Sequence, residues 1–292
     1  MTNQDFAIIT DSSCDLTQQM ANELELTVLP LTFQMDGREY ANYLDERDMP
    51  FHSFYERIRA GEKSQTAAAN IQNFTDTMRP FLDAGRDVLC LAFSSGLSNT
   101  YNAAQLAAQD LSEKYPDRKI FVVDTLCASL GQGLLCYHAV QQKRAGKSID
   151  EVRDFAEQQK QHLCHWFTVN DLNHLKRGGR ISAATALVGT VLGIKPVMHM
   201  DNEGRLSKVS TVRGRVQSLS ALVDHMEKTA INPAEQTVFI SHGDCLEDAQ
   251  KVADMVRERL GVKKIFINYV GPVIGTHSGP GTVALFFLGT ER

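Results

Sequence analysis

The stretch from Asp87 to Thr100 reads DVLCLAFSSGLSNT, and its pattern decides the fold class. Residues 88–93 form an uninterrupted apolar run, which is typical of a strand buried on both faces of a parallel sheet. A turn containing serine and glycine follows, and a helical pattern extends from Leu97 to Lys114. A buried strand that leads through a short turn into a long helix indicates an α/β protein.

The same alternation of strands and helices extends through the N-terminal half of the chain. Further strands are predicted at Phe6–Thr10, Thr27–Met35 and Lys119–Asp124, and the Asp36-Gly37 pair predicts a hairpin turn. Further helices are predicted at Leu16–Leu24, Phe51–Arg59, Phe74–Leu82 and Ala128–Arg144. We therefore expect a mainly parallel sheet with helices on both of its faces.

The pattern changes near residues 145–148, where Ser148 and Glu151 predict a capping box for the next helix. Later strands are predicted at Cys164–Asn170, Pro196–Met200, Arg205–Ser210, Gln236–Ser241, Lys264–Val270 and Val283–Leu288. The two clearest helices in this half are Val216–Thr229 and Leu246–Leu260. We expect a mixed sheet with helices here, and hence two α/β domains that span residues 1–147 and 148–292.

Composition and charge exclude several classes of protein. The chain has 292 residues, 43% of them hydrophobic, and its formal net charge of −5 argues against nucleic acid or an anionic membrane as the main partner. The six cysteines form no CxxC pair, and no leader-like segment precedes the first apolar run at Phe6–Ile9. We interpret the cysteines as reduced thiols of a cytoplasmic protein.

Residues 265–290 contain no charged side chain when His277 is neutral. Glycines and prolines interrupt this stretch, whereas a membrane-spanning helix needs about 20 mainly apolar residues in one piece. We therefore expect no integral membrane segment, but a strand, a turn-rich loop and a second strand.

Signatures of common cofactors and metals are incomplete. Residues 61–64 lack the Gly-Lys-Ser order of a phosphate-binding loop, and residues 131–133 lack the third glycine of a dinucleotide-binding fingerprint. HExxH does not occur, and nothing completes a zinc site around residues 162–165. We therefore expect neither a cofactor nor a metal.

The turn after the strand at residues 88–93 is a candidate anion site. Ser95 offers a hydroxyl and Gly96 a backbone N–H close to a helix start, where free N–H groups and the helix dipole favour negative charge. Ligands of open α/β sheets bind beyond the carboxyl ends of the strands. The alternative is that these residues only cap the helix.

Two further segments carry candidate ligand-binding side chains. Arg180 follows a Gly-Gly turn and precedes the apolar segment Ile181–Ile194, which could hold its guanidinium against an anion, although solvated charge is the simpler interpretation. His277 stands in the glycine- and proline-rich stretch 271–281, where a neutral imidazole could donate to an anion.

Five segments in this order resemble the DegV family of bacterial fatty-acid-binding proteins. They are Thr10-Asp11-Ser12, Ser94-Ser95-Gly96-Leu97-Ser98, Lys176-Arg177-Gly178-Gly179-Arg180-Ile181, Gly193-Ile194-Lys195-Pro196, and Gly271-Pro272 through His277 to Gly281. The resemblance implies a two-domain fold that encloses one long-chain fatty acid, with its carboxylate at the domain interface. It also implies that Ser95 and His277 hold the carboxylate, and that a partner fatty acid kinase converts the bound acid into an acyl phosphate.

The chain departs from the family pattern at two places. Where the family usually has Thr-Ser-Gln-Pro, this chain has Lys63-Ser64-Gln65-Thr66, so the expected threonine is replaced and Ser64 or Thr66 would contact the carboxylate instead. The strand after Gly204 usually ends in Val-Arg-Thr, but here Ser210 replaces the arginine that the family pattern links to kinase docking or carboxylate handling. The second departure removes a residue that the kinase partnership would use, although Arg213 and Arg215 follow closely.

Two other functions are compatible with parts of the pattern. A serine hydrolase of acyl substrates would use Ser95 as nucleophile and His277 as base, but Ser95 lacks a Gly-x-Ser-x-Gly elbow and no aspartate is clearly placed to orient His277. A small-molecule kinase would need a nucleotide-binding motif, which the sequence does not contain. We therefore expect a binding protein without catalytic activity of its own.

Overall fold

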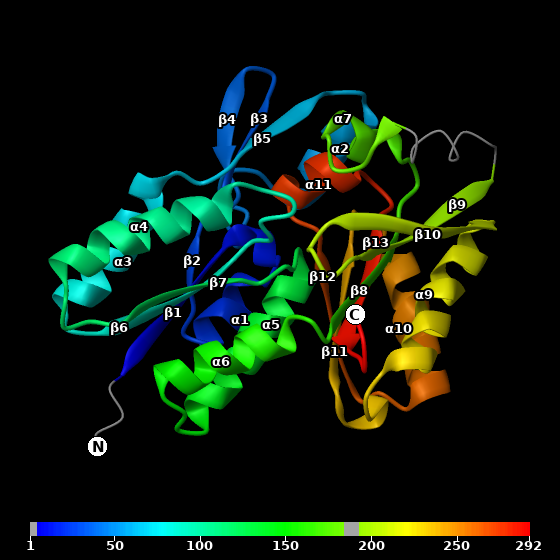
Figure 1. Cartoon of the computed structure of the whole chain (residues 1–292). Coiled ribbons are helices and arrows are strands. Elements are labelled where there is room, and N and C mark those ends of the chain that lie inside the picture. Colours follow the sequence, from blue (N-terminus) through cyan, green and yellow to red (C-terminus); the bar gives the residue numbers. More distant parts are fainter. Residues whose placement is uncertain (1–4, 184–192) are drawn as a thin grey trace.

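The computed structural model describes residues 5–183 and 193–292. Its described part contains a parallel sheet, a small antiparallel sheet and a larger mixed sheet, which we call sheets A, B and C (Figure 1). Helices pack against both faces of sheets A and C. This arrangement confirms the predicted α/β class with a parallel N-terminal and a mixed C-terminal sheet.

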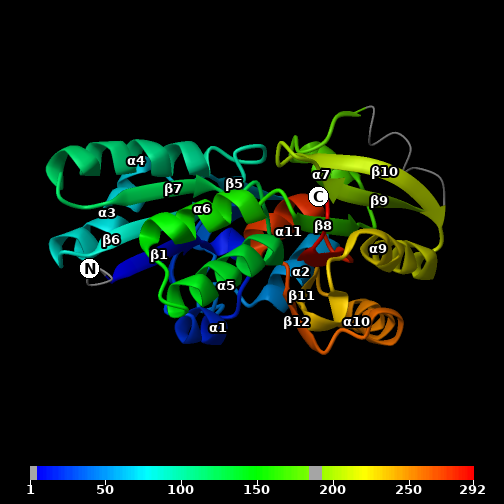
Figure 2. The same cartoon turned by 60° about the horizontal axis from the view of Figure 1, so that its bottom comes forward.

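Sheet A is parallel, with the strand order β2-β1-β6-β7. Its strands are β1 (Phe6–Asp11), β2 (Thr27–Leu29), β6 (Asp87–Ala92) and β7 (Ile120–Asp124). Helices α3 (Ile71–Asp83) and α4 (Thr100–Lys114) cover one face, and α5 (Leu130–Arg144) and α6 (Ile149–Gln159) cover the other (Figure 2). The short elements η1 (Ser12–Cys14) and α1 (Gln18–Glu23) connect β1 to β2.

Helix α6 begins at the predicted capping box, in which Ser148 and Glu151 each bond the other's backbone N–H. It packs on α5 and on strands of sheet A, although it follows the expected boundary between residues 147 and 148. The division of the chain at that boundary stays a prediction.

Sheet C has the strand order β10-β9-β8-β13-β11-β12, and all its neighbours are antiparallel except β11 and β12. Its strands are β8 (Leu163–Thr168), β9 (Ile194–Met200), β10 (Leu206–Arg213), β11 (Thr237–His242), β12 (Lys264–Tyr269) and β13 (Val283–Leu288). Helices α9 (Arg215–Thr229) and α10 (Leu246–Leu260) cover its outer face, and the turn η3 (Pro233–Glu235) precedes β11.

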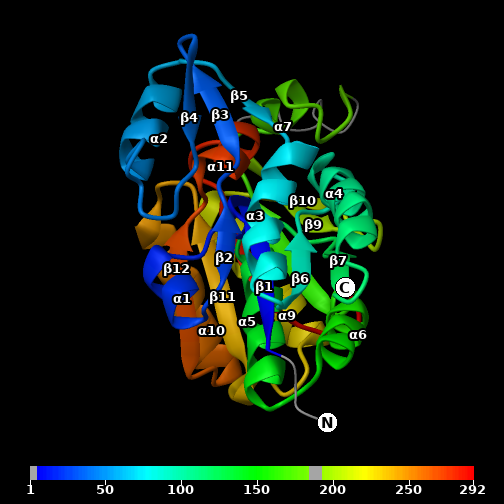
Figure 3. The same cartoon turned by 90° about the vertical axis from the view of Figure 1, so that its left-hand side faces the viewer.

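Sheet B corrects one sequence prediction. The single strand expected at Thr27–Met35 is divided at Pro30 into β2 of sheet A and β3 (Thr32–Met35) of sheet B. Proline has no N–H to donate, so it interrupts a strand ladder. Strands β4 (Arg38–Ala41) and β5 (Ser64–Ala67) flank β3, and α2 (Phe51–Arg59) lies beside them (Figure 3).

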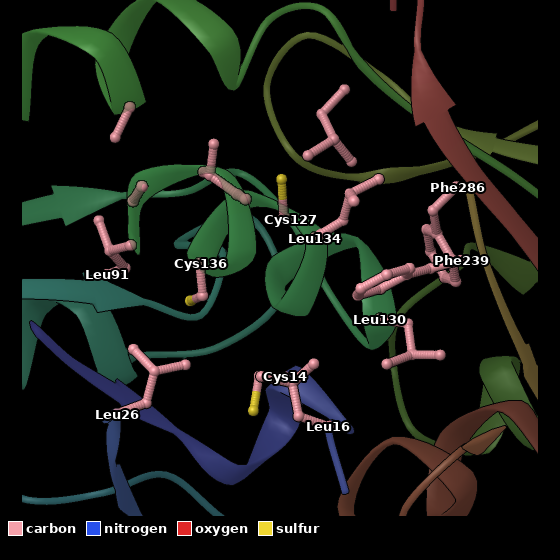
Figure 4. Close-up of a cluster of buried hydrophobic side chains, with 14 of the residues drawn as sticks. Cys14, Leu16, Leu26, Leu91, Cys127, Leu130, Leu134, Cys136, Phe239 and Phe286 are labelled. Carbon is pink, nitrogen blue, oxygen red and sulfur yellow. The ribbon is translucent and has the colours of Figure 1, made fainter. Parts of the chain in front are cut away.

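Helix α5 lies between sheets A and C and joins their cores. Figure 4 shows Leu130, Leu134 and Cys136 of this helix between Leu91 of sheet A and the phenylalanines of sheet C. A helix that is apolar on several sides is expected in such a buried position. All six cysteines are free thiols, and only Cys245 is not fully buried.

The stretch 271–281 corrects a second prediction. It was expected to be a turn-rich loop, but Pro272–Ser278 form the helix α11, which contacts α2, β3, β5 and α7 (Asn173–Arg177). Pro272 is the first helical residue, where its missing N–H costs no bond. Gly275 fits because a Cβ there would lie 2.5 Å from the Tyr55 hydroxyl oxygen. In the described residues we find no helix with the length and apolar character needed to span a membrane.

Candidate functional site

A cavity of about 320 Å³ lies where the three sheets meet. Strands β5, β8, β11 and β13 contribute to its wall, together with α11 and the start of α5. Most of the lining is apolar. The apolar side chains are Leu31, Ala67, Ala68, Phe93, Leu97, Ala128, Phe167, Leu175, Met200, Leu206, Val270, Val273, Ile274, Ala284 and Phe286.

One part of the lining combines Thr66, Arg180 and His277, three of the residues predicted from the sequence. Thr66 comes from β5 and His277 from α11, and Thr66 Oγ1 lies 2.9 Å from His277 Nε2. Arg180 follows the turn after α7. Folding therefore brings together side chains that are at least 97 positions apart in the sequence.

His277 is a neutral hydrogen-bond donor in this site. Its Nδ1 atom is buried, has no hydrogen-bond partner among the described residues and faces Gly178, where a Cβ would lie only 2.1 Å away. An unprotonated Nδ1 is the less costly state there, because a buried N–H without an acceptor loses its bond to water. We therefore assign the proton to Nε2, which donates to Thr66 Oγ1 and leaves the Thr66 hydroxyl proton free for a ligand.

Burial keeps the imidazole of His277 uncharged. Desolvation and, to a smaller extent, the positive charge of Arg180 together lower its pKa to about 4. At neutral pH the described lining of the cavity therefore contains one permanent positive charge, that of Arg180.

Arg180 is half-buried, and its guanidinium is held by backbone carbonyls. Nε and Nη2 donate to the carbonyl of Leu97 at 3.2 and 3.0 Å, and Nη1 donates to the carbonyl of Gly178. Within residues 5–183 and 193–292 no carboxylate forms an ion pair with it. Burial lowers the pKa of Arg180, but a guanidinium stays charged in proteins. Arg180 is thus a partly desolvated cation at the cavity wall, and the N–H groups that do not bond to these carbonyls can donate to an anionic ligand.

The turn before α4 contributes other residues than those predicted. Ser95 is exposed, and its N–H donates to Asp124 Oδ1 at 3.1 Å. Gly96 packs on backbone atoms of Glu203 and Gly204. Neither lines the cavity as the structure describes it, whereas Ser98 and Asn99 of the same turn do. The N-terminus of α4 lies beside the cavity, because its N-cap residue Asn99 is part of the lining.

Ser64 has a supporting position. Its hydroxyl lies 2.7 Å from Thr276 Oγ1 and links β5 to the face of α11 that points away from the cavity. The structure thus groups Thr66, Arg180 and His277 around the cavity and places Ser64, Ser95 and Gly96 outside its lining. The ligand contacts of all six residues stay predictions.

Several polar residues of the cavity were not predicted from the sequence, namely Ser98, Asn99, Ser129, His165, Ser241, Ser278 and Thr282. His165 is fully occupied, since Nε2 accepts from the N–H of Ala128 and Nδ1 contacts the carbonyl of Leu163. Burial lowers its pKa well below the ordinary value. In the described chain we find no group of three or more histidine, cysteine or acidic residues that could hold a metal.

Known proteins match nearly the whole chain in sequence and in structure. A model of the DegV family, described as uncharacterised proteins, matches residues 5–290. A DegV domain-containing protein of Clostridium perfringens is 46% identical over 98% of both chains. Among solved structures, a DegV lipid-binding protein from Thermotoga maritima has a TM-score of 0.85 at 28% identity and covers 99% of both chains. A DegV family protein from Thermus thermophilus, described by its fatty acid binding, has a TM-score of 0.84 at 28% identity and covers 98% of this chain and 99% of its own.

Proposed function

The chain belongs to the DegV family, and we propose that it binds one long-chain fatty acid in the cavity between its three sheets. The observation that carries this proposal is the position of Arg180, a half-buried cation without a carboxylate partner in the described chain, at the wall of an otherwise apolar cavity. Two solved relatives at 28% identity are described as lipid-binding or fatty-acid-binding.

The apolar lining supports a hydrocarbon ligand. Burial of a methylene group is worth about 0.8 kcal/mol, so a long acyl chain gains affinity from a deep apolar wall. A carboxylate at its end must be hydrogen-bonded if it is removed from water. Arg180, the Thr66 hydroxyl and the start of α4 supply donors for it, and the neutral His277 orients Thr66.

We further propose that the carboxylate is presented to a partner fatty acid kinase, which forms an acyl phosphate for lipid metabolism. Ala67, Ala68 and Asn99 line the cavity and are exposed, so the end near Thr66 is open to solvent. A carboxylate held there is accessible to a second protein. In this proposal the chain is the non-catalytic, cytoplasmic subunit, which agrees with its lack of a nucleotide-binding motif.

The hydrolase alternative has less support. A nucleophile and its base must lie within hydrogen-bond reach, if only loosely before substrate binds. Ser95 is exposed and outside the cavity lining, whereas His277 lines it and bonds to Thr66.

Native mass spectrometry of protein purified without added lipid tests the proposal directly, and we expect an adduct with the mass of a fatty acid. Delipidated protein titrated with hexadecanoic acid should then regain a ligand and a higher melting temperature, because a ligand at 100 times its Kd stabilises the folded state by about 2.7 kcal/mol. Arg180→Ala should weaken binding about tenfold to a hundredfold, the loss expected for one bond to a charged group.

The uncharged hexadecanol provides the control for Arg180. It shares the acyl chain but lacks the carboxylate, so its affinity should be the same in wild-type protein and in Arg180→Ala. Protein that remains lipid-free and ignores hexadecanoic acid would contradict the proposed function. Equal losses for the acid and the alcohol would place the carboxylate elsewhere.

A further inference from the structure

Four hydroxyl-bearing residues line the cavity in addition to Thr66 and Ser98. They are Ser129, Ser241, Ser278 and Thr282, and we refer to them as the hydroxyl row. A saturated hydrocarbon chain offers none of them a hydrogen bond. The carboxylate does not need them, because Arg180 and Thr66 already provide donors for it.

Ser129 and Ser241 form a buried chain of hydroxyls that begins at a carboxyl group. Ser129 Oγ lies 2.5 Å from Asp15 Oδ2 and 3.0 Å from Ser241 Oγ. Ser129 has one hydroxyl proton, so it donates to only one of these neighbours at a time. When Ser129 donates to Ser241, the Ser241 hydroxyl proton has no acceptor among the described residues. When Ser129 donates to Asp15, Ser241 can donate to Ser129, and the Ser241 oxygen keeps a free lone pair.

The state of Asp15 favours the first direction at neutral pH. Burial raises the pKa of Asp15 to about 8, so the neutral carboxylic acid can donate to Ser129. Ser129 then donates to Ser241, a fully buried residue of the cavity lining, whose own hydroxyl proton is left free to donate. The backbone of Ser129 is held at a φ of 55°, which is unusual for a residue with a side chain and fixes this geometry at the start of α5.

Ser278 supplies an independent observation. It is 6% exposed, and its Oγ atom is buried without a hydrogen-bond partner in the part of the chain that the structure describes. Val273, Ile274, His277 and Ser278 of α11 all line the cavity, and their spacing places them on one face of the helix. Thr282 is next to it, since Thr282 Oγ1 donates to the Ser278 carbonyl at 3.0 Å.

We propose that the hydroxyl row binds an oxygen substituent on the acyl chain, so that the preferred ligands of this protein are hydroxylated long-chain fatty acids. The inference rests on the proposed function and adds the class of acid. A ligand hydroxyl both donates and accepts, so it can pair with Ser241 in either direction of the chain or with the unpartnered Ser278. Plain methylenes at the same place leave the Ser278 hydroxyl buried and unpaired, which costs binding free energy.

Isothermal titration of delipidated protein tests this inference. The probes are octadecanoic acid and a series of octadecanoic acids that carry one hydroxyl at different carbons. We expect at least one hydroxylated isomer to bind more tightly than octadecanoic acid, because its hydroxyl is paired. In an entirely apolar cavity every hydroxyl would instead weaken binding, by tenfold or more.

Substitutions then locate the contact. Ser241→Ala or Ser278→Ala should reduce the affinity ratio of that isomer to octadecanoic acid about tenfold. Ser112→Ala is the matched control, because its hydroxyl bonds within α4 to the Ala108 carbonyl and lies outside the cavity lining. It should leave the ratio unchanged.

Two outcomes overturn the inference while the proposed function stands. One is tight binding of octadecanoic acid with no hydroxylated isomer that binds more tightly. The other is an affinity ratio that neither Ser241→Ala nor Ser278→Ala changes. Failure of octadecanoic acid and all isomers to bind contradicts the proposed function itself, and the inference falls with it.

Discussion

The two ring nitrogens of His277 have different environments, since one forms a hydrogen bond and the other is buried. Nε2 bonds to Thr66, and Nδ1 lies against Gly178 with no partner within residues 5–183 and 193–292. Since burial holds its pKa near 4, the residue acts through a hydrogen bond and not through a charge. A side chain that keeps an N–H donor should therefore preserve much of its role.

We predict that His277→Gln retains most of the fatty-acid affinity and that His277→Ala loses about tenfold. Alanine leaves Thr66 without its donor and opens a gap beside the carboxylate, whereas glutamine offers an amide N–H. Titration with a fluorescent fatty acid measures both variants. His52→Ala is the control, because His52 is an exposed residue of α2. Equal losses in the Gln and Ala variants would mean that the imidazole itself is required.

We predict a clear difference between Ser95→Ala and Ser98→Ala. Ser98 lines the cavity and Ser95 is exposed outside it, so Ser98→Ala should weaken binding about fivefold and Ser95→Ala should have little effect. Ser98 Oγ also contacts the Thr100 hydroxyl and N–H, so the melting temperatures of both variants need to be compared. A loss confined to Ser95→Ala would support the position expected from the sequence.

At the scale of elements, the packing of α7 against α11 depends on one glycine. Gly178 ends α7 with an ordinary helical φ of −72°, but a Cβ there would lie 2.1 Å from His277 Nδ1. Gly179 has the opposite properties. Its φ is +72°, and nothing lies within 4 Å of a Cβ built there.

We predict that Gly178→Ala weakens fatty-acid binding about tenfold because the methyl group displaces the His277 ring. Gly179→Ala should lower stability by about 1 kcal/mol through backbone strain and leave the affinity near that of the wild type. Binding titrations and thermal melts of both variants check this pair. Similar affinities for the two variants would show that α11 moves freely away from α7.

The sequence pattern predicted those helices and strands whose positions depend on residues close to one another in the chain. The strand at Asp87–Ala92 and the capping box before α6 follow from apolar runs and from single side-chain bonds. Helix α11 was missed because its glycines and Pro272 suggest a loop, and only its contacts with α2, β5 and α7 favour a helix. The strand β5 was missed because residues 64–67 lack an apolar pattern and form a strand only by pairing with β3.

For the cavity, the sequence pattern singled out some of the lining residues and not others. His277, Arg180 and Thr66 have distinctive side chains in distinctive sequence surroundings. Ser129, Ser241 and Ser278 are ordinary serines in the sequence, and only the packing of α5, sheet C and α11 around one cavity gives them a common environment. Which serine of the stretch 94–98 faces the cavity depended on the direction of a turn, and composition does not encode that direction.

At the scale of the molecule, buried titratable groups make stability depend on pH in two opposite ways. His138, His242 and His277 have a pKa near 4 in the folded state against an ordinary 6.5. Between these values the unfolded chain binds more protons, so the free energy of unfolding decreases as the pH falls from 6.5 to 4. Asp15 acts in the other direction, because its folded pKa of about 8 exceeds the ordinary 3.8 and its contribution is lost as the pH rises toward 8.

We predict that Asp15→Asn removes the second effect. Asparagine can still accept the Gly271 N–H and bond to Ser129, but it has no proton to lose. Relative to the wild type, the variant should gain at least about 1 kcal/mol of unfolding free energy between about pH 5 and about pH 8. Denaturant unfolding of both proteins at several pH values measures this difference. Parallel pH profiles would show that Asp15 is charged in the folded protein at neutral pH.

The position of β13 in sheet C determines when a nascent chain can complete this fold. The ribosome releases β8 to β12 before β13, yet β13 lies between β8 and β11 and pairs with both. Sheet A is built from residues before 125, so it can form while translation continues. Sheet C remains as two separate ribbons, with the facing edges of β8 and β11 unpaired and prone to association, until Val283–Leu288 has emerged. The growing chain therefore has no closed cavity between its sheets until β13 has emerged from the ribosome.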